Sequence, residues 1–345
     1  MLMRSFVILF LLIFPLLYLC AQYDTTEYAV MFYNVENLFD PRKDSLRNDD
    51  AFTPKGLNHW TWRKFNRKVS NLSKVILSAN GWSPPDVIGV AEVENEFVLQ
   101  QLCWNTGLKR YNYHYVHYDS PDSRGIDVAL LYRKDRVKVV NSCPIPIVFP
   151  FEPKSRNRDV LYVCITTLQE DTLHFFVNHW TSRYGGYANT IEKRNYYAEV
   201  VKYWSDSLLT STPQAHIVIM GDFNDYPTDE SVLEILQAQP YREDNHLAPL
   251  NNLMYRFSKM RNVGTHKGNE FWGCLDQFIV SASLLDTKND LQIIDRCVEI
   301  YCADFMVVPD EKYGGIKTFR TYLGPRYVGG FSDHLPILLR LKSYK

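Results

Sequence analysis

The feature that most constrains the fold of this chain is a series of short apolar, β-branched runs that recur along most of its length. Examples are "EYAVMFYNV", "DVIGVAEV" and "AHIVIMGD", and such runs are typical of strands in the interior of a sheet. Two longer segments, 60–80 and 190–209, instead have apolar residues at helical spacing. Many strands with a few helices between them predict an α/β sandwich, in which two sheets pack together and helices lie outside.

A third, shorter segment, 229–239, also has a helical pattern, and its acidic first turn suits the start of a helix. The stretches 40–58 and 241–252 are polar and irregular, which is typical of surface loops. No linker rich in Pro, Gly or Ser divides the chain. We therefore expect a single domain over residues 22–345.

The first residues predict export. One arginine precedes an apolar stretch from Phe6 to Leu19, which is short for a membrane span. This pattern is typical of a secretory signal peptide, which we place at residues 1–21, with delivery to the periplasm or the medium. Lipidation of Cys20 is a second alternative, disfavoured because bulky Leu19 stands where a small residue is expected. A retained anchor helix is a third.

Export bears on the six cysteines that follow Cys20, because an oxidising compartment permits disulfides. The sequence contains no CxxC pair and no Cys/His cluster of the zinc type, so we expect no zinc site. The formal net charge is −1 and no long basic run occurs. A tight electrostatic grip on nucleic acid is therefore not indicated, although a metal-assisted nuclease is compatible with this charge.

Polar side chains gather where the apolar runs begin or end. A single Asp, Asn or His at such a point is an ordinary turn or cap residue. This chain repeats the arrangement at six places, which hold Asn34, Glu92, Asn178 with His179, Asp222 with Asn224, Asp276, and Asp333 with His334. A set of carboxylates, amides and imidazoles repeated in this way indicates one shared site rather than six unrelated turns.

The motifs around these residues are, in order, "NVENLF", "EVEN", "NHWTSR", "GDFND", "LDQF" and "SDHLP". With them the chain resembles the endonuclease/exonuclease/phosphatase superfamily, which has the DNase I-like fold, from about Tyr28 to Leu341. The resemblance implies a four-layer α/β sandwich of two mixed β-sheets flanked by helices, with the site at one edge of the sheets. It also implies divalent-metal-dependent cleavage of phosphate esters.

The residue types agree with that chemistry. A divalent cation offsets the phosphate charge that otherwise repels a nucleophile. Mg²⁺ is the expected metal, with Mn²⁺ as an alternative; Mg²⁺ prefers oxygen ligands and keeps several waters, so one or two carboxylates suffice. We expect Glu92 to bind the metal, with Asn34 and Asp333 completing its shell directly or through water.

The resemblance also assigns catalytic roles. Asp276 is expected to hold the His334 imidazole in one tautomer and to raise its pKa. Asp222 would orient the attacking water or protonate the leaving group, and which of Asp222 and His334 is the base stays open. His179 would contact the phosphate or protonate the leaving oxygen, and Asn224 is suited to a phosphate oxygen.

Substrate binding is expected of Asn178 and Arg183, and also of Asn34 in addition to its expected place at the metal. The predicted function is an exported phosphoesterase that cleaves phosphodiester or phosphomonoester bonds by in-line attack of water, with an endonuclease among the candidates. The substrate classes left open are nucleic acids, phospholipids, and sugar or inositol phosphates. A binding module that keeps the fold without catalysis is the alternative from a different class. No protein partner is indicated, and we expect a monomer.

Overall fold

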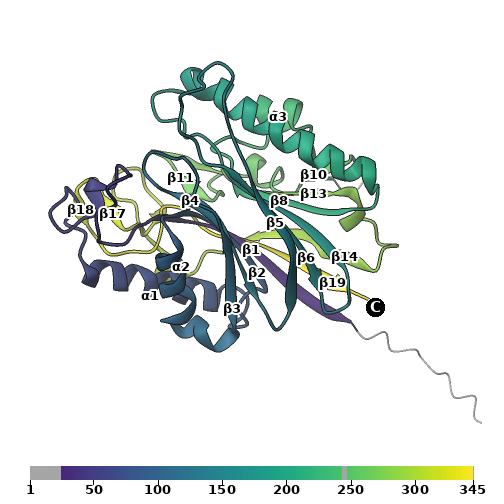
Figure 1. Cartoon of the computed structure of the whole chain (residues 1–345), viewed down its shortest axis with the longest axis horizontal. Helices are drawn as coiled ribbons and strands as arrows, with labels where there is room; N and C mark the ends of the chain where they lie inside the picture. Colours follow the sequence, from purple (N-terminus) through teal and green to yellow (C-terminus); the bar gives the residue numbers. More distant parts are fainter. Residues whose placement is uncertain (1–24, 243–246, 345) are drawn as a thin grey trace, which may run out of the picture.

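The computed structural model describes residues 25–242 and 247–344 of the protein (Figure 1). The expected signal peptide at 1–21, with Cys20, lies outside these residues, so export stays a prediction. Within the described part, no helix combines the length and the apolar composition that a membrane crossing requires. The cysteines described there as unpaired are Cys103, Cys143, Cys164, Cys274 and Cys302.

Two large sheets form the body of the molecule. The six-stranded sheet has the order β14 (Leu291–Ile300), β19 (Ile337–Ser343), β1 (Thr26–Leu38), β2 (Val87–Val93), β4 (Asp127–Arg133) and β3 (Tyr113–His117). The seven-stranded sheet has the order β5 (Val137–Ile145), β6 (Val160–Thr167), β7 (Thr172–His179), β8 (His216–Asp222), β13 (Asp276–Ser281), β10 (Leu250–Asn252) and β9 (Gln239–Pro240). Both are mixed: β1 with β2, β7 with β8 and β10 with β9 are parallel pairs, and pairs such as β1 with β19 and β8 with β13 are antiparallel.

Three helices and several short elements complete the part of the chain that the structure describes. The helices are α1 (Trp62–Ser78), α2 (Glu96–Trp104) and α3 (Tyr187–Ser211). Three two-stranded ribbons are formed by β11 (His266–Lys267) with β12 (Trp272–Gly273), β15 (Val307–Pro309) with β16 (Ile316–Thr318), and β17 (Tyr322–Leu323) with β18 (Arg326–Tyr327). Short 3₁₀ turns are η1 (Asp50–Phe52), η2 (Gly107–Tyr111), η4 (Phe257–Lys259), η5 (Ala282–Leu284) and η6 (Asp304–Met306).

Alternation along the strands produces a sandwich of four layers. In β1, Val30 and Phe32 belong to the core between the sheets, whereas Met31 and Tyr33 belong to the core under α1 and α2. A third core lies between the seven-stranded sheet and α3. Figure 1 shows α3 on one outer side and α1 with α2 on the other. The predicted four-layer α/β sandwich with two mixed sheets is confirmed.

The two sheets pack closely at Gly89 of β2, which has no side chain. A Cβ added to Gly89 of β2 would lie 2.7 Å from the Met220 side chain of β8. The atom it would meet is the terminal methyl of Met220, so a larger residue at Gly89 would require the Met220 side chain to move. Close packing of the sheets at this point brings together side chains that belong to different sheets.

Two of the three predicted helices are found, and the third differs. Segment 229–239 contains only a π-helical turn, η3 (Ser231–Ile235). The amide of Leu236 donates to the carbonyl of Ser231 at 3.0 Å, one residue farther back than in an α-helix. Pro240 follows closely and belongs to the edge strand β9, so little chain remains in which a regular helix could propagate.

Candidate active site

The polar residues predicted at the strand ends come together at one edge of the sandwich. In the seven-stranded sheet, His179 ends β7, Asp222 ends β8 and Asp276 begins β13, and the strand register pairs them directly. The six-stranded sheet and the segment leading into it contribute Asn34 of β1, Glu92 of β2, and Asp333 and His334 just before β19. The site is therefore built by both sheets.

The His334 imidazole forms a buried pair with the Asp276 carboxylate. Its Nδ1 lies 2.7 Å from Oδ2 of Asp276, and its Nε2 lies 3.7 Å from Oδ2 of Asp222. Burial alone would lower the pKa of His334, but the two carboxylates raise it well above its usual value. Asp276 begins β13 of the seven-stranded sheet, and His334 lies in the segment that leads into β19 of the six-stranded sheet. The packing of the two sheets on each other therefore makes this contact.

Asp222 is surrounded by amide donors. Its Oδ2 accepts a hydrogen bond from Nδ2 of Asn34 at 3.0 Å, and its Oδ1 accepts one from the backbone N–H of Asn224 at 2.9 Å. Burial raises the pKa of Asp222 to about 6, although the nearby His334 opposes the increase. A carboxylate with a pKa near the working pH is suited to accepting a proton.

Irregular backbone at two strand ends aims two glutamates into this region. The register shifts once where β1 pairs with β2 and again where β2 pairs with β4. Glu36 and Glu92 lie in these shifts and have positive φ angles of 52° and 67°. Bulges of this kind redirect side chains beside active sites, and strained φ angles concentrate there.

Glu92 carries a charge that no lysine or arginine side chain of the described residues contacts directly. Its Oε1 accepts a hydrogen bond from Nδ2 of Asn34 at 3.2 Å, and its Oε2 accepts one from the backbone N–H of Asn37 at 2.8 Å. Nε2 of His179 lies 3.8 Å from Oε1. A carboxylate that faces only neutral donors and an imidazole at the wall of a cavity fits a ligand for a divalent cation.

Asp333 belongs to a network of four charged side chains. Nη2 of Arg320 lies 2.7 Å from Asp333, Nε of Arg320 lies 3.1 Å from Glu36, and Nζ of Lys68 lies 3.5 Å from Glu36. Burial alone would raise the pKa of Asp333, but His334 and Arg320 hold it below its usual value. Asp333 is therefore ionised and held in place from the side of α1.

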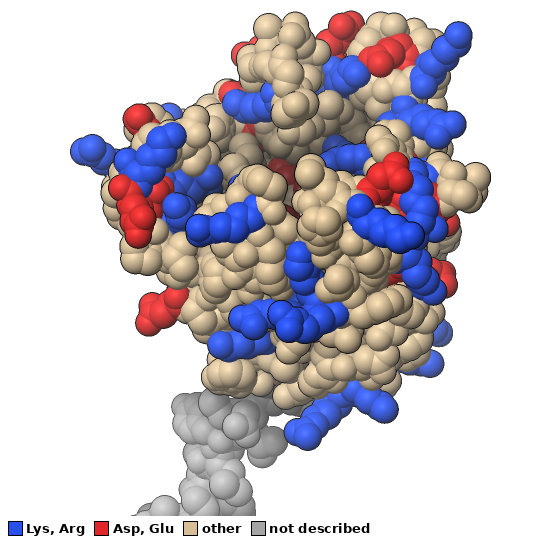
Figure 2. All heavy atoms as spheres, turned by 90° about the vertical axis from the view of Figure 1, so that its left-hand side faces the viewer, with Lys and Arg blue, Asp and Glu red and all other residues tan. Residues whose placement is uncertain are grey.

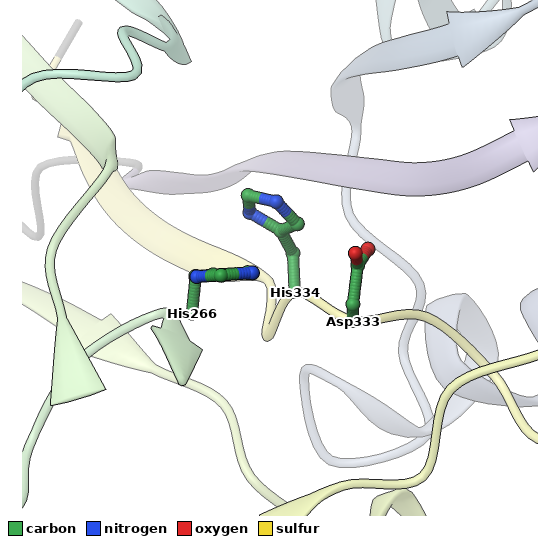
Figure 3. Close-up of side chains that lie close together, drawn as sticks. All are labelled: His266, Asp333 and His334. Carbon is green, nitrogen blue, oxygen red and sulfur yellow. The ribbon is translucent and has the colours of Figure 1, made fainter. Parts of the chain in front are cut away.

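Glu36 and His266 are parts of the site that the sequence did not reveal. Glu36 is inside the motif "NVEN", two residues after Asn34, and this position is the sequence feature that points to it. His266, in "GTHKG", had no apolar run beside it. Its ring centroid lies 4.8 Å from that of His334, and Figure 3 shows His266 and Asp333 on either side of His334. Burial, with the neighbouring His334, lowers the pKa of His266 to about 4.

His179 is buried and electrically neutral. Its Nε2 lies 3.7 Å from Oδ2 of Asp222 and 3.8 Å from Oε1 of Glu92. Burial lowers the pKa of His179 well below its usual value, and the cations of Arg158 and Arg124 add to the effect. A neutral imidazole at this position can donate a single hydrogen bond without adding charge.

Asn224 and Arg183, two other residues predicted for the site, lie at its wall and already contact other groups of the protein. Nδ2 of Asn224 donates to the carbonyl of Trp180 at 3.1 Å. Arg183 lies 2.7 Å from Asp225 and also pairs with Asp229, so two carboxylates already balance its charge. Both residues line the cavity, and their predicted catalytic and substrate-binding roles stay predictions.

Asn178, the third residue expected to bind substrate, does not line this cavity. It is fully buried, its Nδ2 donates to the carbonyls of Phe176 and Met220 at 3.1 and 3.3 Å, and its Oδ1 accepts a hydrogen bond from Trp180 Nε1 at 3.0 Å. These bonds join β7 to β8 and to the loop that follows. They give Asn178 a structural reason to be present, and its predicted contact with substrate stays a prediction.

The site opens to solvent through a cavity of about 360 Å³. Its walls include Glu92, His179, Asp222, Asp333 and His334, and its rim includes Phe271, whose side chain is largely exposed. Figure 2 shows this end of the molecule, where a hollow with acidic atoms in its depth opens between basic side chains. Acidic ligands inside and cations outside are the arrangement expected for a metal site that receives an anion.

Comparison with known proteins identifies the family. The sequence profile of the Endonuclease/Exonuclease/phosphatase family matches residues 29–343. The chain belongs to this family. No curated protein sequence matches the chain. The family's enzymes are metal-dependent hydrolases of phosphate esters, and the protein is an enzyme of this class.

Solved structures share the fold at low sequence identity. A humanised TDP2 of D. rerio is 17% identical, with a TM-score of 0.55 over 91% of this chain and 98% of its own. The human Nocturnin catalytic domain with a bound sulfate anion is 17% identical, with a TM-score of 0.54 over 93% and 97%. A mannosyl-6-phosphatase of Bacteroides thetaiotaomicron is 16% identical, with a TM-score of 0.56 over 91% and 99%. These likenesses support the DNase I-like fold.

Proposed function

We propose that the protein is an exported, Mg²⁺-dependent phosphoesterase that cleaves its substrate by in-line attack of water. The observation that carries this proposal is the His334–Asp276 pair, with a 2.7 Å contact, whose imidazole faces Asp222 at the wall of a cavity that Glu92 also lines. Titratable groups with shifted pKa values that converge on one cavity favour catalysis over a binding module.

The site divides the chemical work among its residues. Glu92 and Asp333 would hold the metal, with Asn34 orienting Glu92 and Asp222 through its Nδ2. A bound Mg²⁺ would supply positive charge that stabilises the oxygens of the phosphate during displacement. Carboxylate and amide oxygens with room for water are the surroundings that Mg²⁺ prefers.

Asp222 is the group we assign as proton acceptor for the attacking water. Its pKa of about 6 leaves it ionised at neutral pH and able to accept a proton. His334 has a raised pKa and is therefore an imidazolium, which suits it to donate a hydrogen bond from Nε2 to a phosphate oxygen. Neutral His179, whose Nε2 lies 3.7 Å from Asp222, can donate a hydrogen bond to a second phosphate oxygen without changing the net charge of the site.

Activity with and without metal tests this proposal. The purified protein should hydrolyse p-nitrophenyl phosphate or bis(p-nitrophenyl) phosphate with added Mg²⁺, and EDTA should abolish the reaction. The relative rates on the two compounds distinguish a monoesterase from a diesterase. A panel of duplex DNA, RNA, sphingomyelin, inositol phosphates and sugar phosphates then identifies the substrate class. Absence of metal-dependent hydrolysis of every compound would refute the proposal.

Export is proposed from the sequence of the first residues. The apolar stretch from Phe6 to Leu19 and the small residue Ala21 support a leader that is removed after residue 21. Sequencing the N-terminus of the native protein should give a start near Gln22. A start at Met1 in a cytosolic fraction would contradict export, and a lipid on Cys20 would replace the signal-peptide interpretation with a lipoprotein.

A further inference from the structure

A second cavity, of about 620 Å³, lies directly beside the catalytic cavity. The two cavities share Arg124 and Ser182 in their walls. Four segments surround the second cavity: the β3–β4 connection, the β5–β6 connection, the loop after β7 and helix α3. A ligand that enters the catalytic cavity therefore has an adjoining space into which a second part of it can extend.

The lining of the second cavity is strongly basic. It contains the four cations Arg124, Arg156, Arg158 and Lys193 and a single carboxylate, Asp122. That carboxylate is already used, because its Oδ2 lies 3.1 Å from Nη1 of Arg158 and its Oδ1 accepts the backbone N–H of Arg124 at 2.9 Å. Glu152 pairs with Lys193 from outside the lining, so two carboxylates face four cations and the cavity keeps a positive potential.

Two of the guanidinium groups are left for a ligand. Lys193 pairs with Glu152 at 2.5 Å, and Arg158 is held by Asp122. Nε of Arg124, by contrast, comes no closer than 4.0 Å to Asp122. No described carboxylate forms an ion pair with Arg156, which is exposed. Guanidinium groups present planar pairs of donors that match phosphate oxygens, whereas water satisfies them less specifically.

The floor of the cavity is rigid and connected to the catalytic centre. Arg158 is buried, and it donates from Nε to the carbonyl of His179 and from Nη2 to the carbonyl of Trp180, both at 2.9 Å. Tyr197 of α3 donates in turn to the carbonyl of Arg158 at 2.7 Å. Arg158 therefore sits on a support that also carries His179 and does not have to be ordered when an anion binds, whereas Arg124 and Arg156 are exposed side chains that close on the anion from the surface.

We propose that this cavity binds a second phosphate group of the substrate, so that the preferred substrates carry at least one phosphate besides the one that is cleaved. The part of this inference that concerns substrate preference rests on the proposed function. The binding of a phosphate group by the cavity does not depend on that function. The second phosphate can belong to a neighbouring nucleotide or to a small bisphosphorylated molecule, since both present the same oxygens to Arg124 and Arg156.

Binding is tested first, without any hydrolysis. Inorganic pyrophosphate is titrated calorimetrically into the metal-free protein in excess EDTA. Arg156→Ala should weaken its binding about tenfold or more, because a charge-assisted hydrogen bond is lost. Lys154→Ala, an exposed cation two residues away that does not line the cavity, is the matched control and should bind pyrophosphate as the wild type does. Equal affinities of wild type and Arg156→Ala would overturn the proposal.

Substrate preference is tested second, with pairs that differ by one phosphate. A thymidine dinucleotide is compared with its 5′-phosphorylated form, and fructose 6-phosphate with fructose 1,6-bisphosphate. The wild type should favour the member with two phosphates in at least one pair, and Arg156→Ala should reduce this ratio of kcat/KM about tenfold. Preference in the first pair identifies a nucleotide source, and preference in the second a small bisphosphate.

The two experiments separate this inference from the proposed function. If no compound is hydrolysed, the proposed function fails, and the pyrophosphate titration alone decides whether the cavity binds phosphate. If single-phosphate compounds are hydrolysed in a metal-dependent way but neither pair shows a preference that depends on Arg156, the proposed function stands and the second phosphate site is refuted.

Discussion

At the scale of single residues, burial separates the protonation states of neighbouring groups. Burial raises the pKa of Asp222 to about 6 and lowers that of His179 well below its usual value, whereas two carboxylates overcome burial at His334. Nε2 of His179 and Nε2 of His334 each lie 3.7 Å from Oδ2 of Asp222. Divergent pKa values in one site are what assign acid and base roles. Here they favour Asp222 as the base.

Asp276 and His334 should act as one unit. Asp276→Asn removes the negative charge that orients the His334 imidazole and keeps it protonated. It should therefore lower kcat/KM nearly as much as His334→Ala, by roughly 10²- to 10⁴-fold. The double variant should lose little more, because residues that work together are strongly non-additive. Steady-state kinetics and melting temperatures of the three variants provide the measurement. Independent, multiplicative losses, or losses explained by unfolding, would contradict the unit.

Glu92 should be required for metal affinity. Glu92→Gln keeps the shape and the ability to accept hydrogen bonds from Asn34 and Asn37 but removes the charge. Calorimetric titration should show weaker Mg²⁺ binding, and activity should be lost at ordinary metal concentrations. Glu96→Gln, which changes an exposed carboxylate on the first turn of α2, is the control and should leave both properties unchanged. Unaltered Mg²⁺ affinity in Glu92→Gln would show that this carboxylate is not a ligand.

At the scale of elements, the sequence was informative where periodicity was strong. The apolar runs became β1, β2 and β8, and the two long amphipathic segments became α1 and α3, because each pattern matches one way of burying a face. Helix α2 was not anticipated; it is short, and its apolar residues fall in a segment without a strong helical pattern. Likewise β11, which carries His266, has two residues and leaves no periodic signal.

The site could be predicted only where a polar residue followed a strand. Glu36 was missed because β1 continues through a register shift to Leu38, where the sequence suggested that the strand stopped near Asn34. The partnership of Asp276 with His334 came from resemblance, since strand periodicity cannot show which residues of two different sheets face each other. Tertiary packing supplies that information.

The free energy of unfolding should depend on one buried charge of helix α1, that of Lys68. Lys68 lies on its inner face, where Nζ donates to Oγ1 of Thr321 at 2.7 Å and lies 3.5 Å from Glu36. Lys68→Met leaves Glu36 with fewer partners in a buried site, so the free energy of unfolding should fall by about 3–5 kcal/mol. Arg63→Met, on the exposed face of the same helix, should change it by less than about 0.5 kcal/mol.

Urea denaturation measures both variants of α1. An Lys68→Met protein as stable as Arg63→Met would mean that the network of Lys68, Glu36, Arg320 and Asp333 holds the site in place without contributing to folding. The network would then be relevant to metal binding alone, through the position of Asp333.

At the scale of the whole molecule, the active site is also a junction between the two sheets. The core between them is apolar, with residues such as Val30, Phe32 and Met220. At its edge, His334 of the segment before β19 contacts Asp276 and faces Asp222 of the other sheet. A charged contact across the sandwich couples the ionisation of the site to the stability of the fold, because the contact is lost when the sheets separate.

The stability of the metal-free protein should therefore depend on pH through His334. In the unfolded chain this imidazole titrates at about 6.5; in the folded protein Asp276 and Asp222 outweigh burial and raise its pKa well above that value. The contribution is fully present below pH 6.5 and is lost as pH rises through the raised pKa, with a slope of up to about 1.4 kcal/mol per pH unit. The unfolding free energy of the wild type, measured with EDTA present, should fall toward that of His334→Gln over this range. His59→Gln, at an exposed position, is the control for the loss of an imidazole away from the site. Parallel curves for wild type and His334→Gln would show that the imidazole has the same pKa in the folded and unfolded states, and that its contact with Asp276 does not stabilise the junction of the sheets.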